Sequence, residues 1–539
     1  MSGASATGQL IVLADQIHTM DPHRPFAQAV AMRDGMITAV GDRGDIARWR
    51  TRDTEIIDLG ASTITPGLVD GHMHPLLGVE LANGVDLSAA RDLDDVITAL
   101  RAHRDNNPGQ EWLQGWGLDP NVFGDKPLTS QPVLTAIGDV PALLTLFDAH
   151  SAIATPAALA RAGITGPVRF DGAASVVCDE HGCPTGHLLE IPAFEMVLAV
   201  MPKPTLGQLR TRLQALLASM AATGLTAGNA MDFNGRADEI MLSLTGEDLP
   251  LRLRFAPICM PGSGPDRLDH IIELQRLTGD RWQVDGVKFM IDGTIDGGTA
   301  WLEKPDCHGQ STAPFWPDPA EYTYSMRYLA AAAVPTVTHA IGDAAVRHVL
   351  DALQPTKPIR VPHRIEHIET IPDDLLPRFA ALDITASMQP THCTLYTRAD
   401  HSDNWSRRLG AERAEHGFRI RELRDARARV ALGSDWPIAP FDPRGIIADA
   451  QLRRRHGRPD DQPVGAHQRL TARMALEGYT THSAAAAGLT DVAGSITVGK
   501  RGDLSAFELD PLTAAPDEFA ESPVPLTVVG GVPTHRAHH

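Results

Sequence analysis

The chain has 539 residues, too many for one simple core and enough for a barrel of ordinary size with one or two accessory domains. Its 67 acidic residues outnumber 48 basic ones, and the net charge of -19 argues against a nucleic-acid partner, because phosphate binding depends on clustered cations. No window reaches the roughly 18 apolar residues of a membrane span, and the first residues lack a signal-peptide pattern. Five scattered cysteines do not form a disulfide framework. We expect a cytoplasmic protein with no membrane partner.

Both ends of the chain carry short alternating runs typical of strands. The dipeptide Asp34-Gly35 lies between two such runs and is a strong hairpin signal. Each end is too thin to bury a core alone, so residues 1–65 and 489–539 are expected to pair in one small β-sandwich. Strands are predicted at 10–13, 27–32, 36–40, 494–498, 503–509 and 526–531.

Between residues 66 and 488, apolar strands alternate with helical stretches. The segment 206–222 carries an apolar stripe at helical spacing, and Gly224 gives a stop signal after it. Strands that alternate with helices predict parallel pairing, and eight such units predict an α/β fold with a (β/α)8 TIM-like barrel. The eight strands are expected to end near His74, Met231, Ile258, Asp292, Ile341, Glu369, Pro390 and Pro437.

A long insertion follows the first barrel strand. About 150 residues separate His74 from the next predicted strand, far more than a βα loop needs. We predict a lid at about 76–204 that covers the catalytic face of the barrel. Candidate substrate contacts within it are Trp116, Asp148, His150 and Glu190.

Polar residues interrupt the apolar runs where five of the predicted strands end. Neighbours at i and i+2 of a strand share a face, so a His-x-His pair can direct both imidazoles at one point. Each residue also has an ordinary explanation: a loop histidine, a lysine in a salt bridge, or an aspartate at a helix N-cap. The four histidines among them, His72, His74, His339 and His367, together indicate a metal site, because barrel strands end on one face. Lys288 and Asp435 are the other two polar residues at these strand ends.

These motifs resemble the metal-dependent amidohydrolase superfamily over nearly the whole chain. The pieces are TPGLVDGHMH, VKFMIDG, THAIGD, RIEHIE, SMQPTH, GSDWP and GSITVGKRGDLSAFELDP. Within the superfamily, HAIGD, RIEH, GSDWP and the long insertion resemble the branch of N-substituted formamide deformylases and related uncharacterised amidohydrolases. The resemblance implies metal-ligand roles for His72, His74, Lys288, His339, His367 and Asp435.

The resemblance also implies a reaction. One or two divalent ions, most simply zinc, are expected, with a carbamate on Lys288 formed from carbon dioxide and bridging two metals. A metal-activated hydroxide would cleave a carbon-nitrogen bond other than a peptide bond in a small amide, for instance an N-formyl or N-acyl compound. Asp435 would take the water proton and pass it to the departing amine.

The substrate pocket has two further candidates, His392 for the amide carbonyl and Trp436 for an apolar wall; a plain loop histidine is the alternative for His392. Many relatives carry a serine-arginine pair after the strand-four lysine, whereas this chain reads DGTIDGGT from Asp292. The absent cation and the added Asp296 argue against an anionic substrate and favour a neutral or amine-like one.

Two other functions stay open. A deaminase of an aminated heterocycle would carry a glutamate three residues after the strand-five histidine, but Gly342 stands three residues after His339. A non-catalytic binding protein on the same barrel is disfavoured by the presence of all six ligand positions. The sequence leaves open the acyl group, the amine, the metal and the oligomeric state, a homodimer included.

Overall fold

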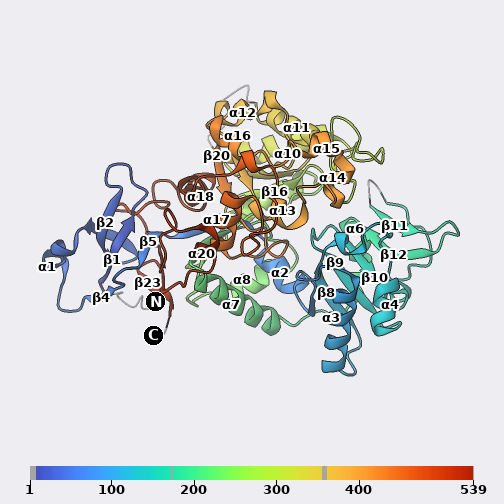
Figure 1. Ribbon diagram of the computed structural model, residues 1–539, viewed down its shortest axis with the longest axis horizontal. Helices are drawn as coiled ribbons and strands as arrows, with labels where there is room; N and C mark the ends of the chain where they lie inside the picture. Colours follow the sequence, from blue (N-terminus) through green and yellow to red (C-terminus); the bar gives the residue numbers. More distant parts are fainter. Residues whose placement is uncertain (1–7, 171–173, 355–360, 538–539) are drawn as a thin grey trace.

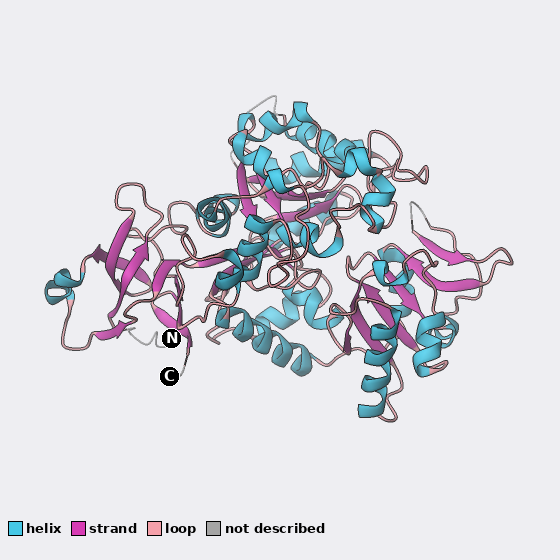
Figure 2. Ribbon diagram, in the orientation of Figure 1, coloured by secondary structure: helices cyan, strands magenta, loops and turns pink. Residues whose placement is uncertain are grey.

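The computed structural model describes residues 8–170, 174–354 and 361–537, which form three parts (Figure 1). A sheet built from both ends of the chain lies at one side, two parallel sheets with their helices lie in the centre, and an inserted part lies at the other side (Figure 2). The fold is therefore mixed α/β. None of the described helices is long and apolar enough to cross a membrane.

Strands from the two ends pair directly in one eight-stranded sheet, in the order β23-β22-β21-β5-β1-β2-β3 with β4 beside β1. The expected sandwich of two facing sheets is instead continuous, because β5 pairs with β1 in parallel and with β21 in antiparallel fashion. Asp34 and Gly35 both have positive φ and form the predicted hairpin turn. The strands are β1 (Leu10–His18), β2 (Phe26–Arg33), β3 (Met36–Gly41), β4 (Glu55–Asp58), β5 (Thr63–Pro66), β21 (Leu504–Phe507), β22 (Leu526–Val529) and β23 (Val532–Arg536).

One predicted strand of this part does not form. Gly494 has a φ of +85°, which turns the chain, and in 494–498 only a single backbone bond, from Ile496 N–H to Thr19 O, crosses to the sheet among the described residues. The terminal sheet also supports the centre of the molecule, since the Ser505 hydroxyl of β21 accepts a bond from Leu68 N–H and donates one to Gly224 O.

The central part contains a strand ending within five residues of each of the eight predicted ends. One parallel sheet has the order β15-β14-β13-β6 and the other β16-β17-β18-β19-β20. The strands are β6 (Leu68–Met73), β13 (Leu225–Ala230), β14 (Arg252–Phe255), β15 (Trp282–Val284), β16 (Val287–Met290), β17 (Thr336–Ala340), β18 (His363–His367), β19 (Thr385–Met388) and β20 (Arg429–Leu432).

Backbone hydrogen bonds connect the two parallel sheets at both ends. Lys288 N–H donates to Pro257 O at 2.9 Å and Cys259 N–H donates to Lys288 O at 2.8 Å, which joins β16 to the chain just after β14. Asp435 N–H donates to His72 O at 2.7 Å, which joins the end of β20 to β6. The carboxyl ends of strands from both sheets therefore face one region.

Helices pack on the outside of these strands. The main ones are α7 (Leu206–Ala222), α8 (Ala237–Ser243), α9 (Pro265–Leu274), α10 (Pro319–Ala331), α11 (Asp343–Leu353), α12 (Leu376–Ala381), α16 (Ile420–Asp425), α17 (Pro443–Leu452), α18 (Ala472–Tyr479) and α19 (Thr481–Ala486). The bounds of α7 match the predicted helix. Gly224, with a φ of +95°, follows its end as predicted.

The N-terminus of α7 carries a capping interaction that can be tested by mutation. Thr205 and Gln208 form a capping box, in which each side chain satisfies a backbone N–H of the other. We expect Thr205→Ala to destabilise the first turn by about 1 kcal/mol, seen as about fivefold faster amide exchange there. Thr211→Ala, at an exposed position inside the same helix, should not speed exchange. Equal exchange in both variants would contradict the capping role.

The insertion contains a separate six-stranded sheet in the order β11-β12-β10-β9-β8-β7, with its own buried apolar clusters. Its elements are β7 (Val85–Asp86), α3 (Leu93–Asn106), β8 (Leu113–Leu118), α4 (Gln131–Ile137), β9 (Ala142–Leu146), β10 (Ser151–Ala154), α5 (Pro156–Arg161), β11 (Ser175–Cys178), β12 (Pro184–Leu189) and α6 (Ile191–Leu198). Helix α2 (Pro75–Leu81) leads into it from β6.

Candidate metal centre

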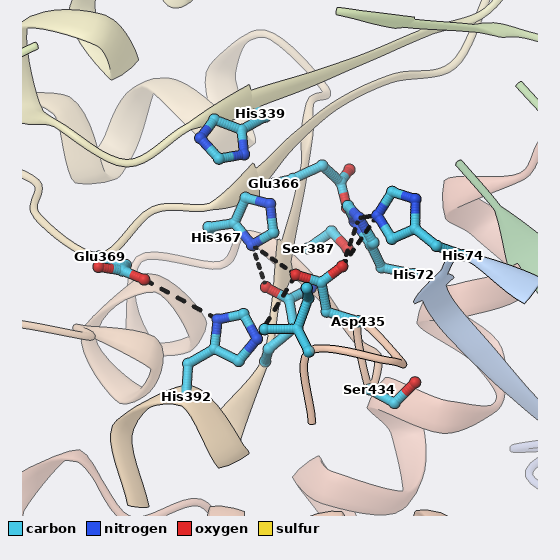
Figure 3. A network of polar contacts seen from close by, with 12 residues as sticks. His72, His74, His339, Glu366, His367, Glu369, Ser387, His392, Ser434 and Asp435 are labelled. Carbon is cyan, nitrogen blue, oxygen red and sulfur yellow. Dashed lines mark hydrogen bonds and ion pairs between the residues drawn. The ribbon is translucent and has the colours of Figure 1, made fainter. Parts of the chain in front are cut away.

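Four predicted ligands meet at the strand ends with their polar atoms almost in contact; Figure 3 shows three of them, His72, His74 and Asp435. Asp435 Oδ1 lies 3.2 Å from His72 Nε2 and 3.1 Å from His74 Nε2, and the two Nε2 atoms are 3.2 Å apart. Lys288 Nζ is 3.4 Å from His72 Nε2. Ligands about 2.0 to 2.1 Å from a tetrahedral zinc ion lie roughly 3.3 Å from one another. The donor set therefore fits a metal of this size.

The other two predicted ligands lie beside this group. The rings of His339, at the end of β17, and His367, at the end of β18, have centroids 4.6 Å apart, and His367 is 5.0 Å from His72 by the same measure. Ligand atoms of His72, His367 and Asp435 all lie within 4.8 Å of one another. The structure thus brings all six predicted side chains to one place.

Hydrogen bonds fix which nitrogen each imidazole offers. His72 Nδ1 lies 2.5 Å from Glu366 Oε2, and His367 Nδ1 lies 2.8 Å from Gln389 Oε1, so each has Nε2 free. His339 Nε2 lies 3.1 Å from the Gly293 carbonyl oxygen, which leaves Nδ1 free. Such outer partners orient ligands and set their tautomers.

The pKa values of His74, His339 and His367 and that of Asp435 are all lowered, but for different reasons. Burial lowers the pKa of His74 to about 4 and holds the pKa values of His339 and His367 well below their usual range. Burial alone would raise the pKa of Asp435, but the neighbouring His72 and His74 outweigh it and hold that pKa well below its usual range. Burial also lowers the pKa of Lys288 to about 8. Neutral imidazole and ionised carboxylate are the forms that bind metals.

Glu366 provides a prediction for this centre. Its two oxygens accept from His72 Nδ1 and from the buried Arg364 guanidinium, whose Nε is 2.6 Å away. We expect Glu366→Gln to weaken metal affinity about 10- to 100-fold and to lower the free energy of unfolding by about 3 kcal/mol, since Arg364 loses its countercharge. Metal titration and denaturant unfolding measure the two effects. Glu303→Gln, which breaks a half-exposed pair with Arg347, should leave metal affinity unchanged. An unchanged metal affinity in Glu366→Gln would contradict the orienting role.

A cavity of about 120 Å³ is lined by five of the six side chains, all but His72, and by residues of both the central part and the insertion. Three of the predicted substrate contacts, Asp148, His150 and His392, line it. His392 Nε2 lies 3.5 Å from Asp435 Oδ2. Glu190 lies behind His150, whose Nδ1 is 3.0 Å away; burial would lower the pKa of His150, but Glu190 raises it to about 9.

The two predicted tryptophans do not line this cavity. Trp116 and Trp436 instead line a neighbouring cleft between the insertion and the central part. The Trp436 ring is turned away because it packs against Gly78 of α2, where a Cβ would lie 2.0 Å from the ring. Neither indole is therefore in position to form the apolar wall; Leu77 and Phe147 are among the apolar residues that line the cavity.

Sequence reasoning missed the residues that hold the ligands. Glu366 and Gln389 orient histidines, and Asp292 accepts three backbone N–H bonds, from Trp301, Ile341 and Gly342, that fix the loop after β17. The Arg-x-Glu spacing in β18, with both side chains buried on one face, was the available signal for Glu366. His363 stands three residues before Glu366, the spacing that a deaminase would use. It begins β18, and its Nδ1 contacts Thr336 Oγ1 at 2.7 Å, so it lies at the end of the strand away from the cavity.

Solved structures share this fold. An uncharacterized metal-dependent hydrolase from Pyrococcus horikoshii OT3 aligns with a TM-score of 0.73 and 23% identity, covering 94% of this chain and 99% of that one. A triazine hydrolase variant aligns with a TM-score of 0.53 and 14% identity, covering 98% and 94% of the two chains. The fold is thus one found in metal-dependent hydrolases.

The sequence pattern of the amidohydrolase family matches residues 55–535, and the chain belongs to that family. It is 26% identical over 520 residues to the putative amidohydrolase YtcJ of Bacillus subtilis (strain 168), covering 96% of this chain and 97% of that protein. It is 25% identical over 543 residues to the N-substituted formamide deformylase of Arthrobacter pascens, covering 97% of each. The predicted family resemblance is confirmed, and family membership supports a hydrolytic enzyme.

Proposed function

We propose that the protein is a metal-dependent hydrolase that cleaves the carbon-nitrogen bond of a small amide, such as an N-formyl or N-acyl amine. The observation that carries the proposal is the convergence of six potential ligands, from strands of both parallel sheets, beside one cavity. We further infer that the two sheets close into one eight-stranded barrel, because hydrogen bonds connect them at both ends.

In this proposal His72, His74 and Asp435 hold one divalent ion, most simply zinc, and His339 and His367 hold a second. Lys288 would be carboxylated and would help to hold the ions; its lowered pKa supports this, because only the neutral amine reacts with carbon dioxide. When bound, such ions acidify water and polarise a carbonyl.

Side chains of the protein transfer the proton, bind the amide oxygen and exclude water. Asp435, held ionised at a lowered pKa, accepts the proton of the attacking water and delivers it to the departing nitrogen. His392 lies 3.5 Å from Asp435 and is placed to donate to the amide oxygen. Phe147 and Ile191, from the insertion, form part of the cavity wall and keep bulk water away from the reacting bond.

Metal analysis combined with a substrate screen tests this proposal. Purified protein should contain one or two divalent ions per chain, and N-formyl, N-acetyl and larger amides should be scored for release of free amine. Removal of metal by a chelator should abolish amine release, and zinc should restore it. Metal-loaded protein that released amine from none of these amides would count against the proposal, and ammonia release from aminated heterocycles would favour a deaminase.

A further inference from the structure

Acidic side chains outnumber lysine and arginine in the lining of the cavity beside the metal centre. Four carboxyl groups line it, Asp148, Asp296, Glu369 and the ligand Asp435, against Lys288, the cationic His150 and no arginine among the described lining residues; burial raises the pKa of Glu369 to about 8. Asp435 and Lys288 belong to the metal centre. The other three carboxylates have no place in the proposed hydrolysis.

These three carboxyl groups have no lysine or arginine partner among the described residues, although the cationic His150 lies beside Asp148 and favours its ionised form. No Lys or Arg of the described residues forms an ion pair with Asp148, Asp296 or Glu369, although each of the three lies in or near the protein interior. The nearest cationic imidazole, His150, is paired with Glu190 at 3.0 Å. A buried negative charge is costly unless a countercharge meets it.

The hydrogen bonds that Asp148, Asp296 and Glu369 accept do not use all of the lone pairs on their carboxylate oxygens. Asp296 Oδ1 accepts from Asn404 at 3.0 Å, and Asp148 accepts from the Thr294 hydroxyl and from the His150 backbone N–H. Glu369 is 8% exposed, and its Oε2 accepts from Trp405 Nε1 at 2.6 Å. Its Oε1 makes no hydrogen bond with the described residues, and the nearest ion-pair partner, His392 Nδ1, is 3.9 Å away. In Figure 3 this oxygen points toward His392, on the side away from Asp435.

The three carboxylates also lie close enough to affect one another. The pKa of Asp296 is raised to about 7, chiefly by burial and in part by the negative charge of Asp148. They do not form a compact metal cage: none of the three belongs to the group of described residues whose ligand atoms lie within 4.8 Å of one another, His72, His367 and Asp435. A primary ammonium suits the arrangement better, because it offers three donors to acceptors that are spread around it.

We propose that the amide substrate bears a cationic amine, which binds among Asp148, Asp296 and Glu369 while the amide lies at the metal centre. This inference rests on the proposed function and narrows its substrate class. The ammonium lies beyond His392, so a short carbon chain separates it from the amide. The apolar side chains of Met290 and Ile341, which line the same cavity, contact that chain.

Matched amides test the proposal. N-formyl diamines with three to six methylene groups are compared with N-formyl alkylamines and N-formyl amino acids of equal length. We expect kcat/KM to fall in the order cationic, neutral, anionic. In Asp296→Asn, which keeps the carbonyl acceptor for Asn404, the preference for the cationic over the neutral amide should fall about tenfold through KM. Glu412→Gln, at an exposed position outside the cavity, should keep the preference.

Two outcomes separate this inference from the proposed function. Amide hydrolysis without a cationic preference, or a preference that Asp296→Asn leaves intact, overturns the inference and leaves the function standing. Direct binding is measured as well, by calorimetry of 1,5-diaminopentane on the metal-loaded protein. Binding that Asp296→Asn weakens about tenfold, without hydrolysis of any amide, supports the cation site and counts against the proposed function.

Discussion

Asp435→Asn is expected to lower kcat by about a thousandfold, while the protein still folds and still binds metal. The amide of asparagine cannot accept the proton of water, and general acid-base groups contribute up to about four orders of magnitude. Steady-state kinetics and metal analysis of the same sample measure the two quantities. The pKa of Asp435 lies well below its usual range, so the wild-type base stays ionised from neutral to mildly acidic pH.

The matched control for this variant is Asp442→Asn. Asp442 caps α17 through a bond from Arg444 N–H, and asparagine caps a helix equally well. That control should keep kcat near the wild-type value. An Asp435→Asn enzyme with metal bound and at least a tenth of the wild-type kcat would remove this residue from the proton transfer.

The second large effect is expected at Lys288. Lys288→Ala should release about half or more of the bound metal and reduce activity about a thousandfold, because the variant cannot form the proposed carbamate, which would hold the ions. Wild-type protein prepared with ¹³C-labelled bicarbonate should show a carbamate carbon signal, and Lys288→Ala should not. Added acetate should restore part of the metal content, because it supplies a carboxylate in the vacated space. A variant that keeps two metals per chain and full activity would contradict the carbamate.

Lys288 also gives the metal-free protein an expected pH dependence. Burial lowers its pKa from 10.5 to about 8, so between these values the unfolded chain binds a proton that the folded chain does not. The free energy of unfolding therefore gains from this group as pH rises from about 8 to 10.5, by roughly 3 kcal/mol in all. Lys288→Met, an apolar side chain of similar length, should lack that gain when unfolding is compared over this window without carbon dioxide. If the free energy of unfolding changed with pH in the same way in the wild-type protein and in Lys288→Met, the lysine would not be desolvated in the folded protein.

The sequence was most informative where chemistry and strand periodicity coincide. His72, His74, His339 and His367 follow apolar runs, and the ends of such runs predict where side chains meet in a parallel sheet. Asp296 could be interpreted from the sequence, but Glu369 could not, because its importance comes from the absence of a lysine or arginine partner, and a missing partner has no sequence pattern. Trp436 shows the opposite error: it follows Asp435 directly, yet Gly78 of α2, distant in sequence, decides where its ring lies.

The support of β6 by the end of the chain bears on how the enzyme matures. β5 and β6 are almost contiguous, and their neighbour β21 lies some 440 positions later, where Ser505 bonds to Leu68. During translation, the segment with the first two histidines is therefore made early but lacks its neighbour until the residues around Ser505 have been made. Metal loading is thus expected only after that point, and a chain cut short before Ser505 should be unable to hold its ions.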